Sequence, residues 1–341
     1  MSGTKECPSH LVYITDEEPG YTRKKWGRGF MYWDDVEDKK IEDNQLLKRI
    51  KDLVIPPMWS RVWISPHEHG HLQVTGYDQK GRKQYIYHQD WTKYRQDAKY
   101  SKLVEFGSAL PTIRRKVNEH INLRGWPKRK ILALIVKLLD EHYIRIGNRH
   151  YVKQNKTYGL TTLRRKHIEE KNGKFFLSYK AKSGKYRNVQ ILNKKLIRII
   201  RKISELPGYE IFKYKDEANQ VQKLDSQEVN RYLEEVSGDC FTAKDFRTWG
   251  GTVLALDCQE AVKEEVKENP KLNLETNIVR RVAQTLGNTV SVCREYYIHP
   301  KVLKVIVSDK LSRYKQKALP KTKYKRELSA SEVTALKIIA N

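Results

Sequence analysis

The chain is poor in cysteine, and the few it has are widely separated. Its cysteines are Cys7, Cys240, Cys258 and Cys293. No C-x-x-C pair occurs, so neither a zinc site nor a redox dithiol is indicated. Reduced, mostly buried thiols of an intracellular protein are the simpler expectation.

Long apolar runs are also missing. The longest, such as Ile131–Leu139, is interrupted by Lys137 and is too short to span a bilayer. Residues Met1–Pro8 lack the apolar stretch of a secretory signal peptide. We therefore expect a protein that neither crosses nor binds a membrane.

Acidic residues are scarce relative to basic ones. The 341 residues include 67 Lys and Arg against 41 Asp and Glu, giving a net charge of +26. The excess is spread along the chain, as expected for a surface that follows a polyanion such as nucleic acid. Basicity that serves only solubility or weak nonspecific attachment is the alternative. The length is sufficient for two domains.

Residues 1–90 are predicted to form a small β-rich domain. Alternating apolar residues and turn signals predict strands over Leu11–Ile14, Phe30–Trp33, Val62–Ile64, His71–Thr75 and Tyr85–Tyr87. A short helix is expected over Gln45–Leu53, ended by Pro56 and Pro57. In the last strand, Tyr85 and Tyr87 share one face because side chains alternate.

Residues 91–308 are predicted to form a larger, mainly helical domain, so the fold class is α+β. Apolar residues at helical spacing predict helices over Leu103–Val117, Arg129–Tyr143, Lys194–Ser204, Ser226–Val236, Asp245–Leu256 and Thr276–Leu286. A β-hairpin is expected over Phe175–Leu192, with its turn at Ser183 and Gly184.

Residues 309–341 form a basic tail with a charged stretch from Lys310 to Arg326. Ser329 and Glu332 have the spacing of a capping box and predict a short terminal helix. The tail is either a solvated appendage or an additional grip on DNA.

Five residues suit transesterification at a phosphodiester. Tyr297 follows Asn288 by nine residues, and the cationic candidates lie upstream: Arg145, Lys182 and Arg247. A tyrosine nucleophile conserves bond energy in a covalent intermediate. The phenol has a pKa of about 10 and the target is anionic, so positive charge is needed.

Each residue type answers one of these difficulties. The planar guanidinium groups of Arg145 and Arg247 fit two non-bridging phosphate oxygens. Asn288 can add a neutral hydrogen bond, and such donors lower a barrier by about two to four kcal/mol each. Lys182, beside the hairpin turn, can protonate the leaving oxygen. No clustered Asp/Glu box points to a metal, and no cofactor is expected.

Taken singly, each residue is more often structural. A tyrosine is usually a packing residue, an arginine at a helix end usually caps carbonyls, and a lysine at a hairpin tip is usually solvated. An asparagine after glycine is most often a turn residue. The joint pattern gains its weight from the longer sequence words around these residues.

Those words resemble the DNA topoisomerase IB family of poxviruses, bacteria and large DNA viruses. The resemblance runs from Leu11 to Val307 and leaves the tail unmatched. It is carried by Ile55–Trp59, Gly70–Gly76, Gly81–Tyr85, Arg145–Asn148, Tyr158–Leu163, Lys244–Thr248 and Tyr297–Pro300.

The resemblance implies a role for each candidate. It makes Tyr297 rather than Tyr296 the nucleophile and Arg145 and Arg247 the phosphate-binding arginines. The hairpin general acid corresponds to Lys182. Because Ala181 stands where the family usually has glycine, Lys180 and Lys185 remain alternatives.

Further positions match phosphate or DNA contacts of the family. Poxvirus members have histidine where this chain has Asn288, whereas bacterial members have asparagine, which contacts phosphate without transferring a proton. The positions that match DNA contacts are Gln84, Tyr85, Tyr87 and Tyr151.

The implied fold is a C-shaped clamp made of the β-rich and helical domains. The implied activity is relaxation of supercoiled double-stranded DNA through a 3′-phosphotyrosine, strand rotation and religation, without ATP or metal. A monomer without an obligate protein partner is expected. It would be intracellular and DNA-associated, in a bacterial nucleoid or, for a virus, in the virion and host cytoplasm.

Two other functions compete with this one. A tyrosine recombinase shares the chemistry, but it usually has histidine where Lys244 stands and a helical N-terminal domain. A non-catalytic, basic DNA-binding protein would explain the charge but not the five suitable site residues.

The charge generates a first prediction. Affinity for duplex DNA will fall steeply and linearly with the logarithm of salt concentration, because bound phosphates release counterions. Fluorescence anisotropy at increasing NaCl measures this slope. A flat response would contradict binding along the DNA backbone.

Overall fold

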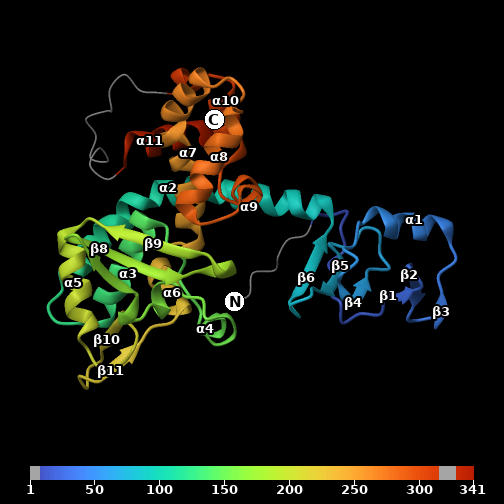
Figure 1. The fold of residues 1–341 in the computed structure, drawn as a ribbon, viewed down its shortest axis with the longest axis horizontal. Helices are drawn as coiled ribbons and strands as arrows, with labels where there is room; N and C mark the ends of the chain where they lie inside the picture. Colours follow the sequence, from blue (N-terminus) through green and yellow to red (C-terminus); the bar gives the residue numbers. More distant parts are fainter. Residues whose placement is uncertain (1–7, 315–327) are drawn as a thin grey trace. The chain divides into compact units, whose positions relative to one another are not determined.

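The computed structural model describes residues 8–314 and 328–341. The chain divides into two compact units, one ending at Lys99 and the other beginning at Tyr100, and each is described by itself. The first unit is β-rich and the second is mainly helical (Figure 1). The predicted α+β fold class is therefore confirmed. The division falls inside helix α2 (Gln89–Ile121).

The first unit is built on one antiparallel sheet with strand order β3-β2-β1-β4-β5-β6. Its elements are β1 (Tyr21–Trp26), β2 (Gly29–Asp34), β3 (Lys39–Lys40), α1 (Asn44–Asp52), β4 (Ser60–Ile64), β5 (Leu72–Tyr77) and β6 (Lys83–Tyr87). Helix α1 begins where the Asp43 side chain accepts hydrogen bonds from the backbone of Gln45 and Leu46. It packs Ile50 onto a core with Val62, Ile64 and Val74.

The predicted strand over Leu11–Ile14 is not a strand of this sheet. Only Val12 forms a bridge, with Gly70. The backbone N–H of Ile14 donates to His71 Nδ1 instead of a strand partner. Leu11 and Ile14 are buried, so apolar packing explains the sequence pattern without a ladder.

The second unit combines helices with a three-stranded sheet of order β7-β8-β9 and a two-stranded one. Its strands are β7 (Ile168–Lys171), β8 (Lys174–Lys180), β9 (Tyr186–Ile191), β10 (Lys213–Lys215) and β11 (Val221–Lys223). Its helices after α2 are α3 (Lys128–His142), α4 (Arg149–Asn155), α5 (Lys194–Ser204), α6 (Ser226–Ser237), α7 (Ala243–Glu268), α8 (Leu274–Leu286), α9 (Val290–Tyr296), α10 (Pro300–Val307) and α11 (Ala330–Ala340).

Helices α3 and α7 carry the centre of this unit. Nearly every residue of α3 from Ile131 to Leu139 is buried. Helix α7 approaches its neighbours closely at two glycines. A Cβ on Gly250 would lie 2.1 Å from the Tyr143 ring, and one on Gly251 would lie 2.3 Å from the Tyr297 carbonyl oxygen. Figure 1 shows α7, α8, α10 and α11 gathered into one cluster.

The predicted hairpin is present as β8 and β9. Its turn covers Lys182–Gly184, with positive φ at Ser183 (64°) and Gly184 (77°). Ala181, where the family usually has glycine, has φ −94° and ψ −177° and is buried. This extended conformation is open to any residue, so alanine fits there without strain.

The terminal helix predicted from Ser329 and Glu332 is confirmed as α11, with both hydrogen bonds of the capping box. The helix packs on α7 and α10. Most of the basic stretch from Lys310 to Arg326 lies outside the described residues.

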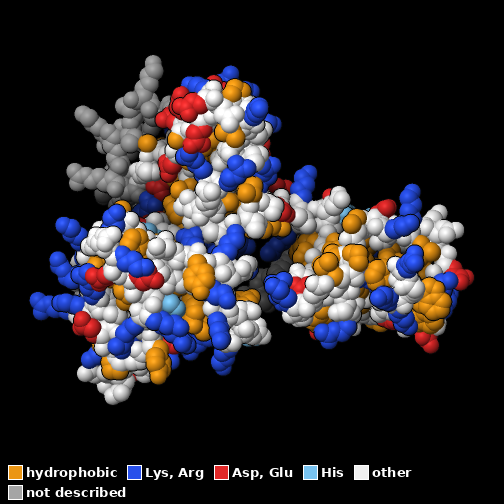
Figure 2. Space-filling model, in the orientation of Figure 1, with side chains coloured by type: hydrophobic (Ala, Val, Ile, Leu, Met, Phe, Trp, Pro, Cys, Tyr) orange, Lys and Arg blue, Asp and Glu red, His pale blue; other side chains and the backbone are white. Residues whose placement is uncertain are grey.

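Lysine and arginine side chains cover much of the visible surface of each unit, with fewer acidic ones (Figure 2). Within residues 8–314 and 328–341, no helix is long and apolar enough to cross a membrane. The same residues contain no group of three or more His, Cys, Asp or Glu side chains placed to hold a metal ion.

Candidate active site

Three of the predicted site residues meet around one amide oxygen. Arg145 comes from the extended segment after α3, Arg247 from the first turns of α7, and Asn288 from the turn between α8 and α9. The guanidinium groups of both arginines donate hydrogen bonds to Asn288 Oδ1, the one from Arg247 at 3.3 Å. Segments more than a hundred residues apart in sequence thus converge at one point.

The orientation of the Asn288 amide follows from this arrangement. Guanidinium groups can only donate, so the oxygen faces them and Nδ2 faces away. Nδ2 is buried and has no hydrogen-bond partner among the described residues. Gly287 before it has φ +65°, and a Cβ there would lie 2.6 Å from an Arg187 nitrogen. Glycine therefore fits this turn without strain or contact with Arg187.

Arg247 is the most enclosed cation of the cluster, with 4% of its surface exposed. It donates to the carbonyl oxygens of Tyr143 and, at 2.9 Å, Leu286. Burial, and then the charge of Arg145, lower the pKa of Arg247. Its Nε atom is buried without a partner in the described part of the chain. A buried guanidinium with an unused donor is suited to receive an anion.

Tyr297 lies against this cluster. The Arg247 Cζ is 5.2 Å from the centre of its ring, within range of a cation–π contact. Tyr297 ends α9, where its N–H donates to the Cys293 carbonyl at 3.0 Å. The hydroxyl of Tyr100 donates to the carbonyls of Glu295 (3.1 Å) and Ile298 (2.9 Å) and so fixes the backbone on both sides of Tyr297.

The neighbouring Tyr296 has a different environment. Its side chain is partly exposed, and burial together with the Glu295 carboxylate raises the pKa of Tyr296 to about 12. A nearby carboxylate opposes formation of the tyrosinate that attack on phosphorus requires. The structure brings Tyr297, not Tyr296, to the arginines.

The β8–β9 hairpin reaches the same turn through residues other than Lys182. Lys185 Nζ donates to the Asn288 carbonyl at 2.9 Å, and an Arg187 nitrogen donates to the Thr285 carbonyl at 2.7 Å. Arg187 also lies near Tyr179. Lys182 is exposed at the turn and forms no hydrogen bond or ion pair with any described residue.

Two residues of the site, Arg187 and Tyr100, were not predicted from the sequence. Arg187 had a usable signal, since Lys185 and Arg187 alternate after the turn and therefore share one face of the strand. Tyr100 had no signal in the sequence. It is 195 residues before Glu295, and only the fold brings its hydroxyl to the backbone beside Tyr297.

The remaining candidates are surface residues. Tyr85 and Tyr87 are exposed on β6 with their rings stacked at 6.0 Å, as the strand alternation predicts. Gln84 Nε2 donates to Asp78 at 3.0 Å. Tyr151 lies on α4 and is 52% exposed. Exposed aromatic and amide groups on a basic surface are suited to contact nucleic acid.

The chemistry of the cluster is that of an anion site beside a phenol. Burial and then the charge of Arg187 lower the pKa of Arg145, and burial and then the charges of Arg145 and Arg187 lower the pKa of Arg247, so the three arginines lie close together. Buried donors on Arg247 and Asn288 remain without partners among the described residues. A tetrahedral phosphoryl group, with several acceptor oxygens and negative charge, matches these donors.

Comparisons with known proteins agree with this chemistry. A family model described as the catalytic core of eukaryotic DNA topoisomerase I matches residues 84–326. A second, described as the N-terminal domain of bacterial DNA topoisomerase IB, matches residues 29–78.

Similar proteins occur in viruses. The chain is 31% identical over 240 residues to DNA topoisomerase 1B of Acanthamoeba polyphaga mimivirus, covering 69% of this chain and 70% of the relative. It is 24% identical over 299 residues to DNA topoisomerase 1 of rabbit fibroma virus (strain Kasza), covering 83% and 90%. For DNA topoisomerase 1B of vaccinia virus (strain Copenhagen) the identity is 23% over 238 residues, covering 69% and 72%.

The shared oxygen of Asn288 generates a stability prediction. Asn288→Asp will raise the free energy of unfolding by about 1–3 kcal/mol, because a carboxylate between two guanidinium groups replaces a neutral acceptor. The new carboxyl will have a lowered pKa. The gain will therefore be complete above the ordinary value of about 4 and disappear as the pH falls through the lowered one.

Urea unfolding of the wild-type protein, Asn288→Asp and Asn288→Ala at pH 7 measures this. Asn288→Ala removes the acceptor and serves as the control. An aspartate variant no more stable than the alanine variant would show that the two arginines do not depend on this oxygen.

Proposed function

The chain belongs to the type IB DNA topoisomerase family, and from that premise we propose that it relaxes supercoiled DNA through a phosphotyrosine formed at Tyr297. One observation carries the assignment. The Arg247 guanidinium lies against the Tyr297 ring, with its Cζ 5.2 Å from the ring centre, and shares an acceptor with Arg145. A phenol and two guanidinium groups at one point are what attack on an anionic phosphorus requires.

The proposed step is an exchange of ester bonds. The phenol of Tyr297 gives up its proton to solvent as its oxygen attacks the scissile phosphorus, forming the phosphorus–tyrosine bond while the bond to the 5′ oxygen breaks. The 3′ phosphate becomes attached to the enzyme, and the 5′ oxygen leaves as a hydroxyl. Rotation of the free end releases torsional strain, and the 5′ hydroxyl then reverses the exchange. No ATP or metal takes part, because the supercoil supplies the energy.

In this step the arginines bind the phosphate and stabilise the charge that develops on it. In the free protein Arg145 and Arg247 donate to Asn288 Oδ1. A bound phosphate can take up the unused donors, Arg247 Nε and Asn288 Nδ2, and then share the guanidinium groups. Each preorganised donor contributes about 2–4 kcal/mol to lowering the barrier.

The hairpin supplies the proton for the leaving oxygen. We assign this role to Lys182, which stands exposed at the turn and is not held by another described residue. Lys185 and Arg187 hold carbonyls of the α8–α9 region. These two residues dock the hairpin beside the site, and Lys182 is left to act on the substrate.

DNA contacts outside the reacting phosphate are proposed for Gln84, Tyr85 and Tyr87 in the first unit and Tyr151 in the second. We also propose that the protein acts on double-stranded DNA inside the cell or virion.

All the proposed catalytic groups belong to one chain, so we propose that the protein is a monomer. Sedimentation velocity at micromolar concentration would reveal a dimer if this assignment of oligomeric state is wrong.

Tyr297→Phe tests the nucleophile. It removes one oxygen, so relaxation of supercoiled plasmid in EDTA without ATP will be abolished while DNA affinity stays within about twofold of the wild type. The readouts are agarose-gel topoisomers and anisotropy. Tyr296→Phe is the matched control and will relax plasmid.

Loss of activity in the Tyr296 variant with activity kept in Tyr297→Phe would move the nucleophile by one residue. A wild-type protein that shifts plasmid mobility without producing relaxed topoisomers would be a DNA-binding protein only. Recombination of paired sites without relaxation would indicate a recombinase.

Lys182→Ala tests the general acid. Single-turnover cleavage will slow by about 10²–10⁴-fold with little change in affinity. A substrate with sulfur at the bridging 5′ position will restore the rate, because a thiolate leaves without protonation. The parallel variant Lys185→Ala will be impaired on both substrates. If only Lys185→Ala is rescued by sulfur, the roles of the two lysines are reversed.

A further inference from the structure

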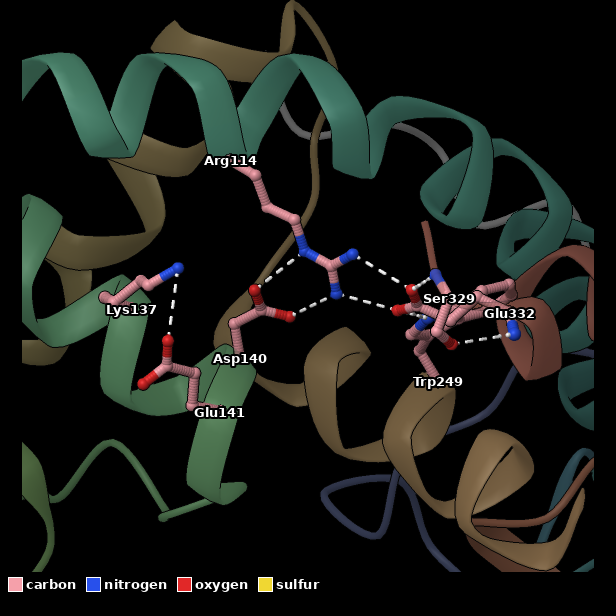
Figure 3. Close-up of polar contacts among 7 residues, drawn as sticks. All are labelled: Arg114, Lys137, Asp140, Glu141, Trp249, Ser329 and Glu332. Atoms are coloured by element: carbon pink, nitrogen blue, oxygen red, sulfur yellow. Dashed lines mark hydrogen bonds and ion pairs between the residues drawn. The ribbon is translucent and has the colours of Figure 1, made fainter. Parts of the chain in front are cut away.

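A buried ionic cluster joins the C-terminal helix to α7, which carries Arg247, and to α3, which precedes Arg145. Figure 3 shows Arg114 on α2 between the carboxylates of Asp140 on α3 and Glu332 on α11. This helix begins beyond residue 326, where the match to the family's catalytic core ends.

Arg114 binds both carboxylates in forked geometry. Its nitrogens donate to the two oxygens of Asp140 at 2.8 Å each, and to those of Glu332 at 2.7 and 3.0 Å. All three side chains are mostly buried, and only 7% of the Glu332 side chain is exposed. Charged groups are rarely buried to this extent unless they are fully paired.

Glu332 makes two further contacts. The indole N–H of Trp249 on α7 donates to Glu332 Oε1 at 3.1 Å. The other oxygen accepts the backbone N–H of Ser329 at 2.7 Å, closing the capping box at the start of α11. One carboxylate therefore ties α11 to α2 and α7 and, through Arg114, to α3.

Helices α7 and α3 both lead directly to the active site. Trp249 is two residues after Arg247 on α7. Asp140 lies in the last turn of α3, just before Tyr143, whose carbonyl accepts from Arg247. Tyr143 also packs against Gly250, where α7 has no space for a Cβ. Trp249 and Asp140 are therefore both linked to Arg247 by short stretches of helical backbone and the Tyr143 carbonyl.

The Trp249 ring is closely packed between neighbouring helices. A Cβ on Gly107 of α2 would lie 2.5 Å from the Trp249 ring and 2.8 Å from Leu336 of α11. Nearby on α3, Lys137 pairs with Glu141 at 3.2 Å, a separate contact that does not reach Glu332 (Figure 3). The Trp249 ring is therefore closely packed against α2, beside Leu336 of α11.

We propose that α11 is a positioning element of the active site, in which Glu332 fixes Arg247 and the end of α3 through Trp249, Arg114 and Asp140. This inference rests on the proposed role of Arg247 in cleavage. Glu332 does not touch the reacting groups, so it is a positioning residue and not a catalytic one.

Glu332→Gln is the direct test. Glutamine keeps the size and the capping-box geometry but loses the charge that holds Arg114. Single-turnover cleavage of a duplex oligonucleotide will slow by about tenfold to a hundredfold, because small displacements of positioned groups are costly. DNA affinity, measured by anisotropy, will stay within about twofold. Lys337→Gln removes a charge from the same helix and is the control, expected to cleave at the wild-type rate.

A second measurement separates positioning from loss of stability. In an Arg247→Ala background, Glu332→Gln will change the cleavage rate by less than about twofold, because residues that act through one another are not additive. All rates are measured well below the midpoint of thermal unfolding of each variant. If Glu332→Gln does not fold, Trp249→Phe keeps an aromatic ring, loses the N–H donor together with part of the ring's packing, and is expected to show the same coupling.

Several outcomes would overturn the proposal. Folded Glu332→Gln, or Trp249→Phe in its place, that cleaves at the wild-type rate would contradict it. Equal effects with and without Arg247 would show that α11 contributes only stability. Failure of the wild-type protein to cleave would instead refute the proposed function, so the two failures are distinguishable.

Discussion

The structure depends on holding like charges together away from water. Arg145, Arg187 and Arg247 lie near one another, and burial and mutual repulsion lower the pKa of Arg145 and Arg247. Neutral oxygens make this arrangement tolerable, namely the Asn288 amide and main-chain carbonyls at the ends of α3 and α8. Dipoles stabilise the cations without neutralising them. The site therefore keeps its attraction for a phosphate, which a buried carboxylate would cancel.

Those carbonyls are available because the helices end where they do. Helix α3 ends at Tyr143, which has a left-handed conformation, and α8 ends at Gly287. Helix α7 presents Arg247 from its first turns, and its two adjacent glycines allow Tyr143 and the Tyr297 backbone to approach. The carboxylates of Asp140 and Glu332 in the second unit's ionic cluster are paired with Arg114. Negative charge stabilises the scaffold without entering the anion site.

Much of this organisation could be predicted from the sequence. Helical spacing gave α5 with its bounds and α3 to within a residue, and alternation with a turn signal gave the β8–β9 hairpin. The prediction of a strand over Leu11–Ile14 was wrong, because burial by neighbouring elements produces the same apolar pattern as pairing in a sheet. Tyr100 and the Arg114 cluster could not be predicted, since their partners are distant in sequence. The catalytic roles, including that of Lys182, stay predictions.

The central claim is that Tyr297 becomes covalently attached to DNA. The most direct measurement traps the intermediate with a nicked or short duplex, digests the protein, and identifies the modified peptide by mass spectrometry. The account predicts a nucleotide linked through its 3′ phosphate to the peptide residue Tyr297, formed in EDTA. An adduct on Tyr296, a linkage through a 5′ phosphate, or cleavage without any adduct would contradict it.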